Sequence, residues 1–591
     1  MFLDCFNRYF FKQSECLEIP DMPLAYWESE ESIAVFKHKK LGEILFAKTG
    51  VTTGDNDIFL RLWFEVSQDS WQRKWFPLNK GGEYRKWYGN NEYVINWEHN
   101  GLEIKHFPGS TIRNEEFYFR EGVTWSKITA AKFSARYSPA THMFDAVGLT
   151  CFSDGHIPAE YILAYLCSCV AQKYVKVLNQ TVSYTVGTVN NLPFIYNVEQ
   201  SALIADIARA CINSAKTDWD SFETSWEFQM HPLVRYRIMK RFFSINEDGS
   251  FTEPVSYTVQ DAFEIWKEEC ENRFRNQKEN EEKLNRLFID IFSLHDELTP
   301  GVEDKDVTLH HADLGRDIRS LISYAVGCMF GRYSTDEPGL IFAGDNFGDY
   351  YVTLNEPVGE YLDRVLTVDH DKVTVDVTVK TDCGLLNHNG KQIKLIFPPD
   401  ADGIIPITDD EYFNDDIVSM FVRWLERVFG RETLEENLKF IADALGGKGT
   451  PRDVIRQYFL NDFYKDHLKI YQKRPIYWLF DSGKRNGFKC LIYMHRYQPD
   501  TLARIRTDYL HELQGRYRNA IETLERQIAG ASTSERVKLQ KRLTALKAQA
   551  EEARVYEEKI HHLADQMIKI DLDDGVKHNY ALFKDVLAPI K

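Results

Sequence analysis

Residues 510–528 read LHELQGRYRNAIETLERQI and carry the strongest apolar periodicity in the chain. A second periodic stretch, from Leu539 to Ile570, follows a break at Gly530–Ser534. Apolar residues three and four positions apart share one face of a helix, so the pattern predicts two helices that bury a common seam as an antiparallel hairpin. The periodic positions of the first stretch are Leu510, Leu513, Tyr517, Ile521, Leu524 and Ile528.

The charges on this predicted hairpin are mixed in sign. Arg516 and Arg518 lie close in sequence to Glu522 and Glu525. A mixed outer face favours a packed scaffold pair or a docking arm over a track for phosphates.

The sequence upstream of the hairpin alternates between helix-like and strand-like spacing. Glu160–Leu178 and Val259–Phe292 have helical spacing, and Val373–Lys380 is the clearest alternating strand. At 591 residues the chain is too long for a single core. We therefore predict an α+β multidomain fold, divided into a mixed α/β domain (1–200), a helical connector (201–300), a second small mixed α/β domain (301–430), a helical and mixed domain (431–500), and the helical hairpin with its tail (501–591).

The net charge of −17 argues at first against a polyanionic partner, but the charges are unevenly distributed. No acidic residue occurs from Gly122 to Phe144 or from Tyr161 to Val198. Residues 71–90 contain a single acid, Glu83, beside five bases: Arg73, Lys74, Lys80, Arg85 and Lys86. Polyanion binding requires a local positive face and not a basic protein, so nucleic acid remains a candidate partner; ordinary solvated faces are the alternative.

Residues 71–97 combine those bases with aromatic and amide side chains. Bases neutralise phosphates, amides pair with adenine edges, and aromatic rings stack on exposed bases. The alternative is the core of a β-rich domain with its charges at the rim. The aromatic residues are Trp71, Trp75, Phe76, Tyr84, Trp87, Tyr88, Tyr93 and Trp97, and the amides are Asn79, Asn90, Asn91 and Asn96.

The loop from Thr52 to Asp57 (TTGDND) is a second candidate for base recognition. Its hydroxyl, amide and carboxylate groups can donate to or accept from base edges. A plain turn closed by an Asx side chain is the alternative.

Several classes of protein are disfavoured by what the sequence lacks. No apolar run is long enough to span a bilayer, and no basic segment precedes an apolar one at the start, as in a signal peptide. The ten cysteines are scattered, which favours reduced thiols and a cytoplasmic location. No phosphate-binding loop, dinucleotide fingerprint, zinc-ligand spacing or catalytic triad motif is found, so we assign no catalytic and no metal-binding residue.

Eight segments together resemble the adenine-specific DNA methyltransferases of BREX phage-resistance systems, of the PglX type. They are spread over most of the chain: Thr53–Trp63 (TGDNDIFLRLW), Lys74–Pro77 (KWFP), Lys80–Asn91 (KGGEYRKWYGNN), Gly122–Ser126 (GVTWS), Asp218–Trp226 (DWDSFETSW), Asp296–Pro300 (DELTP), Ser323–Tyr333 (SYAVGCMFGRY) and Trp478–Gly483 (WLFDSG).

The resemblance implies a methyl-transfer domain followed by a target-recognition region. The first binds S-adenosylmethionine at a glycine-rich loop and holds a flipped adenine at an Asn-Pro-Pro-Tyr motif, and neither motif occurs in this sequence. We therefore expect the chain to correspond to the recognition portion, as a split gene, a truncated reading frame or an excised fragment. Within the resemblance, residues 40–200 look like a specificity domain, closed by a Leu-Pro motif at Leu192-Pro193, and the hairpin resembles the spacer helices of specificity subunits.

The sequence and the resemblance together predict sequence-specific recognition of duplex DNA by a chain that does not transfer methyl groups and binds no cofactor itself. S-adenosylmethionine would bind the missing catalytic half, which is an expected partner together with other defence-system proteins. The alternatives are a complete methyltransferase with divergent motifs and a scaffold that binds only proteins. The predicted DNA-binding residues are Thr53, Asp55, Asn56, Arg61, Lys74, Lys80, Arg85, Lys86, Trp87, Asn90, Asn91, Arg113, Lys127 and Arg136.

Overall fold

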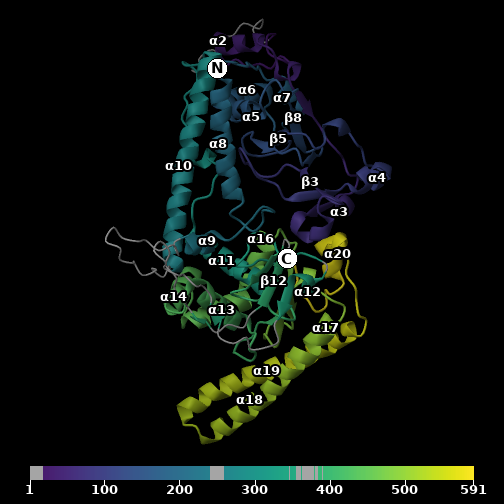
Figure 1. Cartoon of the computed structure of the whole chain (residues 1–591), viewed down its shortest axis with the longest axis vertical. Coiled ribbons are helices and arrows are strands. Elements are labelled where there is room, and N and C mark those ends of the chain that lie inside the picture. The colour runs from purple at the N-terminus through teal and green to yellow at the C-terminus, as the bar shows by residue number, and fades with distance from the viewer. Residues whose placement is uncertain are drawn as a thin grey trace, which may run out of the picture. The chain divides into compact units, whose positions relative to one another are not determined.

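A computed structural model describes residues 17–239, 258–344, 346–353, 361–362, 378–379, 384–388 and 391–590 (Figure 1). Its mixed helices and small sheets confirm the predicted α+β class. The chain forms two compact units, each built from separate segments. Unit 1 comprises 1–63, 70–221 and 267–312, and unit 2 comprises 64–69, 222–266 and 313–591. These segments interleave along the chain, whereas the five predicted ranges follow one another.

Unit 1 contains an antiparallel sheet of four strands in the order β1-β8-β5-β6. The strands are β1 (Phe46–Lys48), β8 (Gly148–Phe152), β5 (Gly122–Ser126) and β6 (Ala135–Ser138). Apolar side chains of this sheet form one core with those of four helices, because each element offers one apolar face to the others. The helices are α5 (Ala159–Cys167), α6 (Cys169–Leu178), α8 (Ser201–Trp219) and α10 (Val259–Phe292), of which unit 1 takes the part from Lys267 onward.

A second sheet of unit 1 has the order β2-β4-β3-β7. Its strands are β2 (Leu60–Leu62), β4 (Tyr93–Asn96), β3 (Trp75–Asn79) and β7 (Met143–Phe144), and only the β3–β7 pair is parallel among the described strands. A smaller core joins this sheet to α4 (Glu98–His106) and α3 (Asn56–Phe59). Two further short helices of the unit are α2 (Glu30–Ala34) and α7 (Val186–Asn190).

The predicted helix Glu160–Leu178 is divided in two at Ser168. The backbone of Ser168 is extended, with φ −71° and ψ 158°, and its hydroxyl accepts a hydrogen bond from the amide of Ala171. Serine is a favoured N-cap because its oxygen satisfies an amide that has no partner within the helix. α6 therefore begins anew after α5. Similarly, Thr185 caps α7, because its hydroxyl accepts a hydrogen bond from the amide of Thr188.

Unit 2 contains two sheets of three strands and several helices. One sheet has the order β14-β16-β15 (Ile404–Pro406, Lys489–Tyr493, Tyr477–Asp481), and the other β13-β12-β9 (Lys391–Lys394, Gly384–His388, Tyr351–Thr353). A two-stranded pair joins β10 (Tyr361–Leu362) to β11 (Thr378–Val379); the rest of the predicted strand Val373–Lys380 lies outside the described residues. The helices are α9 (Pro232–Met239), α11 (Leu314–Met329), α12 (Phe347–Tyr350), α13 (Ile417–Phe429), α14 (Leu434–Leu445), α15 (Pro451–Asn461), α16 (Phe463–Ile470) and α20 (Gly575–Ala581).

The hairpin predicted from residues 510–570 is present in unit 2. It begins with α17 (Thr501–Arg504) and a π-helical turn (Ile505–Leu510), and Figure 1 shows α18 (His511–Gly530) and α19 (Thr533–Ala564) lying side by side. Leu513, Tyr517 and Leu524 of α18 are buried, as the periodicity predicted. Ser532 and Glu535 form a capping box that starts α19.

Among the described helices, none is both long and apolar enough to cross a membrane. Within the same residues, no group of histidine, cysteine and acidic side chains is arranged to hold a metal ion. The thiols of Cys151, Cys167, Cys169, Cys211, Cys328 and Cys490 are not joined in disulfides.

Candidate nucleic-acid interface

The loop predicted to read bases is a capped turn at the start of α3. The Asp55 carboxylate accepts a hydrogen bond of 2.8 Å from the amide of Asp57, and the hydroxyl of Thr53 donates to Oδ1 of Asn56 at 2.6 Å. Gly54 has a φ of +78°, which side chains rarely adopt. Thr53 is buried and Asn56 is exposed. The loop therefore contains the turn closed by an Asx side chain, which was the alternative prediction. It also contains an exposed amide, that of Asn56, of the kind that base recognition uses.

A second loop, residues 109–113, is fixed beside the first. The amides and carbonyls of Thr52 and Thr111 bond reciprocally, at 2.9 and 2.8 Å. A Cβ atom on Gly54 would lie 2.9 Å from the backbone of Gly109, so this approach requires glycine. The exposed Arg113 donates to the hydroxyl of Thr52 at 3.0 Å. We call residues 52–57 and 109–113 the paired loops; they bring together four predicted residues, Thr53, Asp55, Asn56 and Arg113.

Two predicted cations meet at the buried ring of Trp75. The guanidinium carbon of Arg61 lies 5.2 Å from the ring centroid, and Nζ of Lys74 lies 5.8 Å from it. Arg61 also donates to the carbonyl of Asp57 at 2.5 Å, next to the paired loops. Both cations are partly exposed, and the ring and the carbonyl hold them in place.

Lys80 and Lys127 lie near the β7–β8 connection and differ in pairing. Nζ of Lys80 lies 2.6 Å from the carboxylate of Asp145, which also accepts hydrogen bonds from the amides of Val147 and Gly148 at 2.7 Å. Lys80 therefore neutralises a carboxylate that shapes a turn. Lys127 is partly exposed, and its backbone amide donates to the carbonyl of Val147.

Lys86 and Trp87 lie in the core, not at the surface. Both the Lys86 ammonium and the Trp87 indole N–H donate to the Glu281 carboxylate, the indole at 2.7 Å. Only 5% of Lys86 and 2% of Trp87 is exposed. Burial acts to lower the pKa of Lys86, but the charge and hydrogen bond of Glu281, together with Tyr84 and Cys167, raise that pKa overall. These contacts argue against direct contact of either side chain with DNA.

Arg136 and Arg85 are also largely enclosed. Arg136 is 2% exposed, and burial followed by repulsion from Arg85 lowers its pKa to about 10. Arg85 packs over the Trp219 ring at 4.9 Å and lies 3.9 Å from the buried carboxylate of Asp218. Burial lowers the pKa of Arg85 as well. Arg136 is therefore a core residue. The Arg85 guanidinium faces the buried Asp218 and the Trp219 ring more than it faces solvent.

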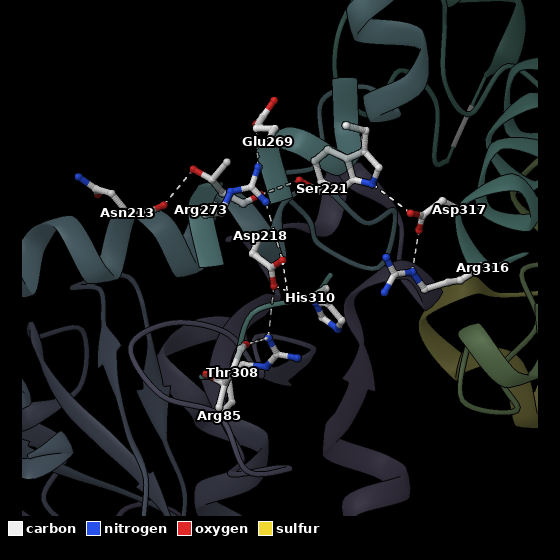
Figure 2. Close-up of polar contacts among 12 residues, drawn as sticks. Arg85, Asn213, Asp218, Ser221, Glu269, Arg273, Thr308, His310, Arg316 and Asp317 are labelled. Carbon is white, nitrogen blue, oxygen red and sulfur yellow. Dashed lines mark hydrogen bonds and ion pairs between the residues drawn. The ribbon is translucent and has the colours of Figure 1, made fainter. Parts of the chain in front are cut away.

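The carboxylate of Asp218 is the centre of this inner polar cluster. Figure 2 shows Arg85, Arg273 and His310 pointing toward it. Its oxygens lie 2.8 Å from Nδ1 of His310 and 3.9 Å from Nη1 of Arg273, and the amide of His310 donates to it at 3.1 Å. The cluster connects α8 and α10 to the residues around His310, near the end of the last segment of unit 1. Its role is therefore structural.

The remaining two predicted residues shape a turn. Asn90 has a φ of +58° and donates to the carbonyl of Glu83 at 2.9 Å, while Asn91 is 5% exposed. Asparagine tolerates the left-handed conformation, which accounts for Asn90 at this position. Within the described residues, no contact joins Asn90 or Asn91 to the paired loops.

Sequence reasoning missed the partners that decide these roles. Glu281, Asp218 and Asp145 each neutralise a predicted cation, and Thr111 and Gly109 hold the loop of Asn56. All of these contacts bridge more than 50 residues of chain, so local spacing gives no signal for them.

Comparison with known proteins gives two curated relatives, and no protein-family model matches. The chain is 39% identical over 608 residues to the adenine-specific methyltransferase PglX of Lacticaseibacillus casei (strain Zhang), covering 98% of this chain and 46% of that protein. It is 34% identical over 625 residues to the adenine-specific methyltransferase BrxX of Escherichia coli O9:H4 (strain HS), covering 100% of this chain and 46% of that protein. The chain thus spans about half the length of the curated relatives it matches.

Proposed function

Because this chain belongs to the PglX-type adenine-specific methyltransferases of BREX systems and spans about half the length of its relatives, we propose that it is the DNA-recognition portion of such a protein. Its partners in this proposal are duplex DNA and a methyl-transferring half, in a cytoplasmic phage-defence complex. The observation that carries the proposal is the fixed pairing of two loops that present Asn56 and Arg113 together.

The paired loops suit base recognition because their frame is rigid while their side chains are exposed. Asn56 offers an amide of the kind that pairs with an adenine edge, and Arg113 offers a planar donor group of the kind that pairs with guanine. Arg61, Lys74 and Lys127 supply positive charge for phosphates, which position a protein on DNA without reading its sequence. Lys86 and Arg136 have no part in this proposal, because their exposure would require unfolding of the core.

One cavity of unit 1 offers no unpaired carboxylate to the methyl donor that the family uses. Unit 1 contains a cavity of about 570 Å³ lined by Trp27, Lys86 and Cys167 among others. Each of its four carboxylates is ion-paired with a lysine: Glu28 with Lys173, Glu281 with Lys86, Glu303 with Lys305 and Asp306 with Lys132. No carboxylate of this cavity is left unpaired for the ribose hydroxyls of S-adenosylmethionine, which supports our assignment of methyl transfer to the other half.

A binding selection tests the proposal. The chain would be incubated with duplexes that contain randomised positions, and bound sequences would be read. We expect enrichment of one short site, and loss of that enrichment in Asn56→Ala with Arg113→Gln. The matched control is Asn461→Ala with Arg431→Gln, an exposed amide and arginine of unit 2. Equal recovery of all sequences by the unaltered chain would contradict the proposal.

A further inference from the structure

The distal part of the hairpin has a charge opposite to that of the whole chain. Residues 516–547, which we call the hairpin tip, contain eight bases and three acids, a net charge of +5, whereas the chain carries −17. Within α18 no excess appears, because Arg516 and Arg518 lie close in sequence to Glu522 and Glu525. The excess appears when the start of α19 is included, with Arg536, Lys538, Lys541, Arg542 and Lys547.

Some cations of the tip are neutralised by neighbours. Arg516 bonds to Glu512 at 2.5 Å, Lys547 to Glu525 at 2.7 Å, and Arg542 lies 3.4 Å from Asp410. Arg518, Lys538 and Lys541 are exposed and have no ion pair among the described residues. Arg526 and Arg536 donate only to the backbone carbonyls of Glu522 and Ala531 within that same part of the chain.

Helix stability does not account for this arrangement. Cations stabilise the last turn of a helix and are unfavourable in the first. The last turn of α18 has no base, while α19 has Arg536 directly after its capping box. Lys538 lies three residues before Lys541, so these two unpaired cations are neighbours on one face of α19 and repel each other. A polyanion on that face removes the repulsion.

We infer that the hairpin tip binds the phosphate backbone of duplex DNA without reading its sequence. The inference rests on the proposed function, and it adds a second DNA contact, in unit 2. Lysine and arginine neutralise phosphates and release the ions condensed on them. The one aromatic residue of the tip, Tyr517, is 1% exposed, so it presents no ring for stacking on a base. The tip therefore adds affinity, and the paired loops determine which site is preferred.

Crosslinking tests the contact directly. Val537 in the tip is 68% exposed, and Val555, nearer the base of the same helix, is 41% exposed. A photoreactive phenylalanine analogue would replace each valine separately in the full chain, with a labelled random-sequence duplex as probe. We expect the duplex to crosslink at position 537 and not at 555. Equal yields at both positions, or none at 537, overturn the inference.

Salt titration gives an independent measure. We expect Arg518→Gln with Lys538→Gln and Lys541→Gln to reduce the slope of log K against log salt by about 2–3, since each phosphate contact contributes about 0.9. The control, Lys439→Gln with Lys448→Gln and Lys484→Gln, removes three exposed charges elsewhere in unit 2. If both variants give the same slope, the tip makes no phosphate contact.

The outcomes separate this inference from the proposed function. If the selected site persists in the unaltered chain but the tip variant matches its control, recognition stands and the tip contact is wrong. If the chain binds DNA through the tip but selects no site, the tip contact stands and recognition is wrong. If the unaltered chain does not bind duplex at low salt, both are wrong.

Discussion

The Lys86 ammonium and the Glu281 carboxylate form a buried ion pair between residues 195 positions apart in the chain. The carboxylate also accepts from the Trp87 indole, so the group connects α10 to the segment before β4. Burying both charges has a large desolvation cost that only the pairing offsets, and loss of one partner leaves the other charge uncompensated.

We therefore expect Glu281→Leu to destabilise the protein strongly, by about 3–5 kcal/mol. Lys86→Met combined with Glu281→Leu should cost less than Glu281→Leu alone, because no lone charge remains. Thermal unfolding of the three proteins measures this. The exposed pair of Arg554 and Glu551 is the control, and Arg554→Gln should leave the melting temperature nearly unchanged. A double variant less stable than Glu281→Leu would contradict the interpretation.

Salt dependence should show whether the partly exposed lysines of unit 1 contact phosphates. Lys74→Gln and Lys127→Gln should each lower the slope of log K against log salt by about 0.9 without changing stability, because both side chains are partly exposed. Lys439→Gln serves as the control, with no expected change. Fluorescence anisotropy over a series of salt concentrations measures the slope. An unchanged slope in both variants would exclude these lysines from the phosphate contacts.

The seam of the hairpin should contribute to stability and not to site preference. Leu524 is 5% exposed, so Leu524→Asp places a charge among apolar side chains and should cost roughly 2–5 kcal/mol. The exposed neighbour Gln527→Asp introduces the same group without burial and should be nearly neutral. Tm and the selected DNA site would be measured for both. A changed site with unchanged stability would mean that the hairpin reads DNA.

Acid should weaken unit 2 through buried histidines. Burial lowers the pKa of His231 to about 3, against an ordinary value of 6.5, so below 6.5 the unfolded chain binds a proton that the folded state does not. The contribution of neutral His231 to the free energy of unfolding is therefore fully present above pH 6.5 and is lost as the pH falls toward 3. In His231→Asn, the side chain can still accept from the amide of Leu233 but does not titrate. Between pH 7 and 4, we expect the free energy of unfolding of His231→Asn to fall by roughly 2–3 kcal/mol less than that of the unaltered chain. Parallel pH profiles of Tm would contradict this.

The chain alone should not bind S-adenosylmethionine or methylate DNA. The sequence has neither a cofactor loop nor an Asn-Pro-Pro-Tyr motif, and every carboxylate around the described cavity is paired. Calorimetry with the cofactor and transfer of a labelled methyl group measure the two activities. Binding in a one-to-one ratio, or label in DNA, would favour the alternative of a complete methyltransferase.

The sequence predicted elements whose signal is local. The helix Val259–Phe292 was predicted with the bounds that the structure has, because its periodicity is long and uninterrupted. Glu160–Leu178 was predicted as one helix, since the spacing of apolar residues hides a break made by the Ser168 hydroxyl. Helix propensity and apolar spacing are properties of residues that are close in sequence. A single capping hydrogen bond, such as that of Ser168, leaves both nearly unchanged.

The candidate site was less predictable, because charge alone does not give exposure. Lys74 and Lys86 belong to one basic run, yet the first is partly exposed and the second is buried on Glu281. The loop of Asn56 was identified from its composition, whereas its fixation by Thr111 depends on a strand order that spacing does not specify. The sequence thus pointed to the region, and the tertiary contacts divide it into surface and core.

The hydrogen bonds between Thr52 and Thr111 use only main-chain atoms, so they are indifferent to the side chains on either side. Substitutions at Asn56 or Arg113 remove one side-chain hydrogen bond each but leave these main-chain bonds intact. If the paired loops read DNA, a bacterial lineage can acquire a new protected site by a few point changes, and the rest of its defence machinery needs no adjustment.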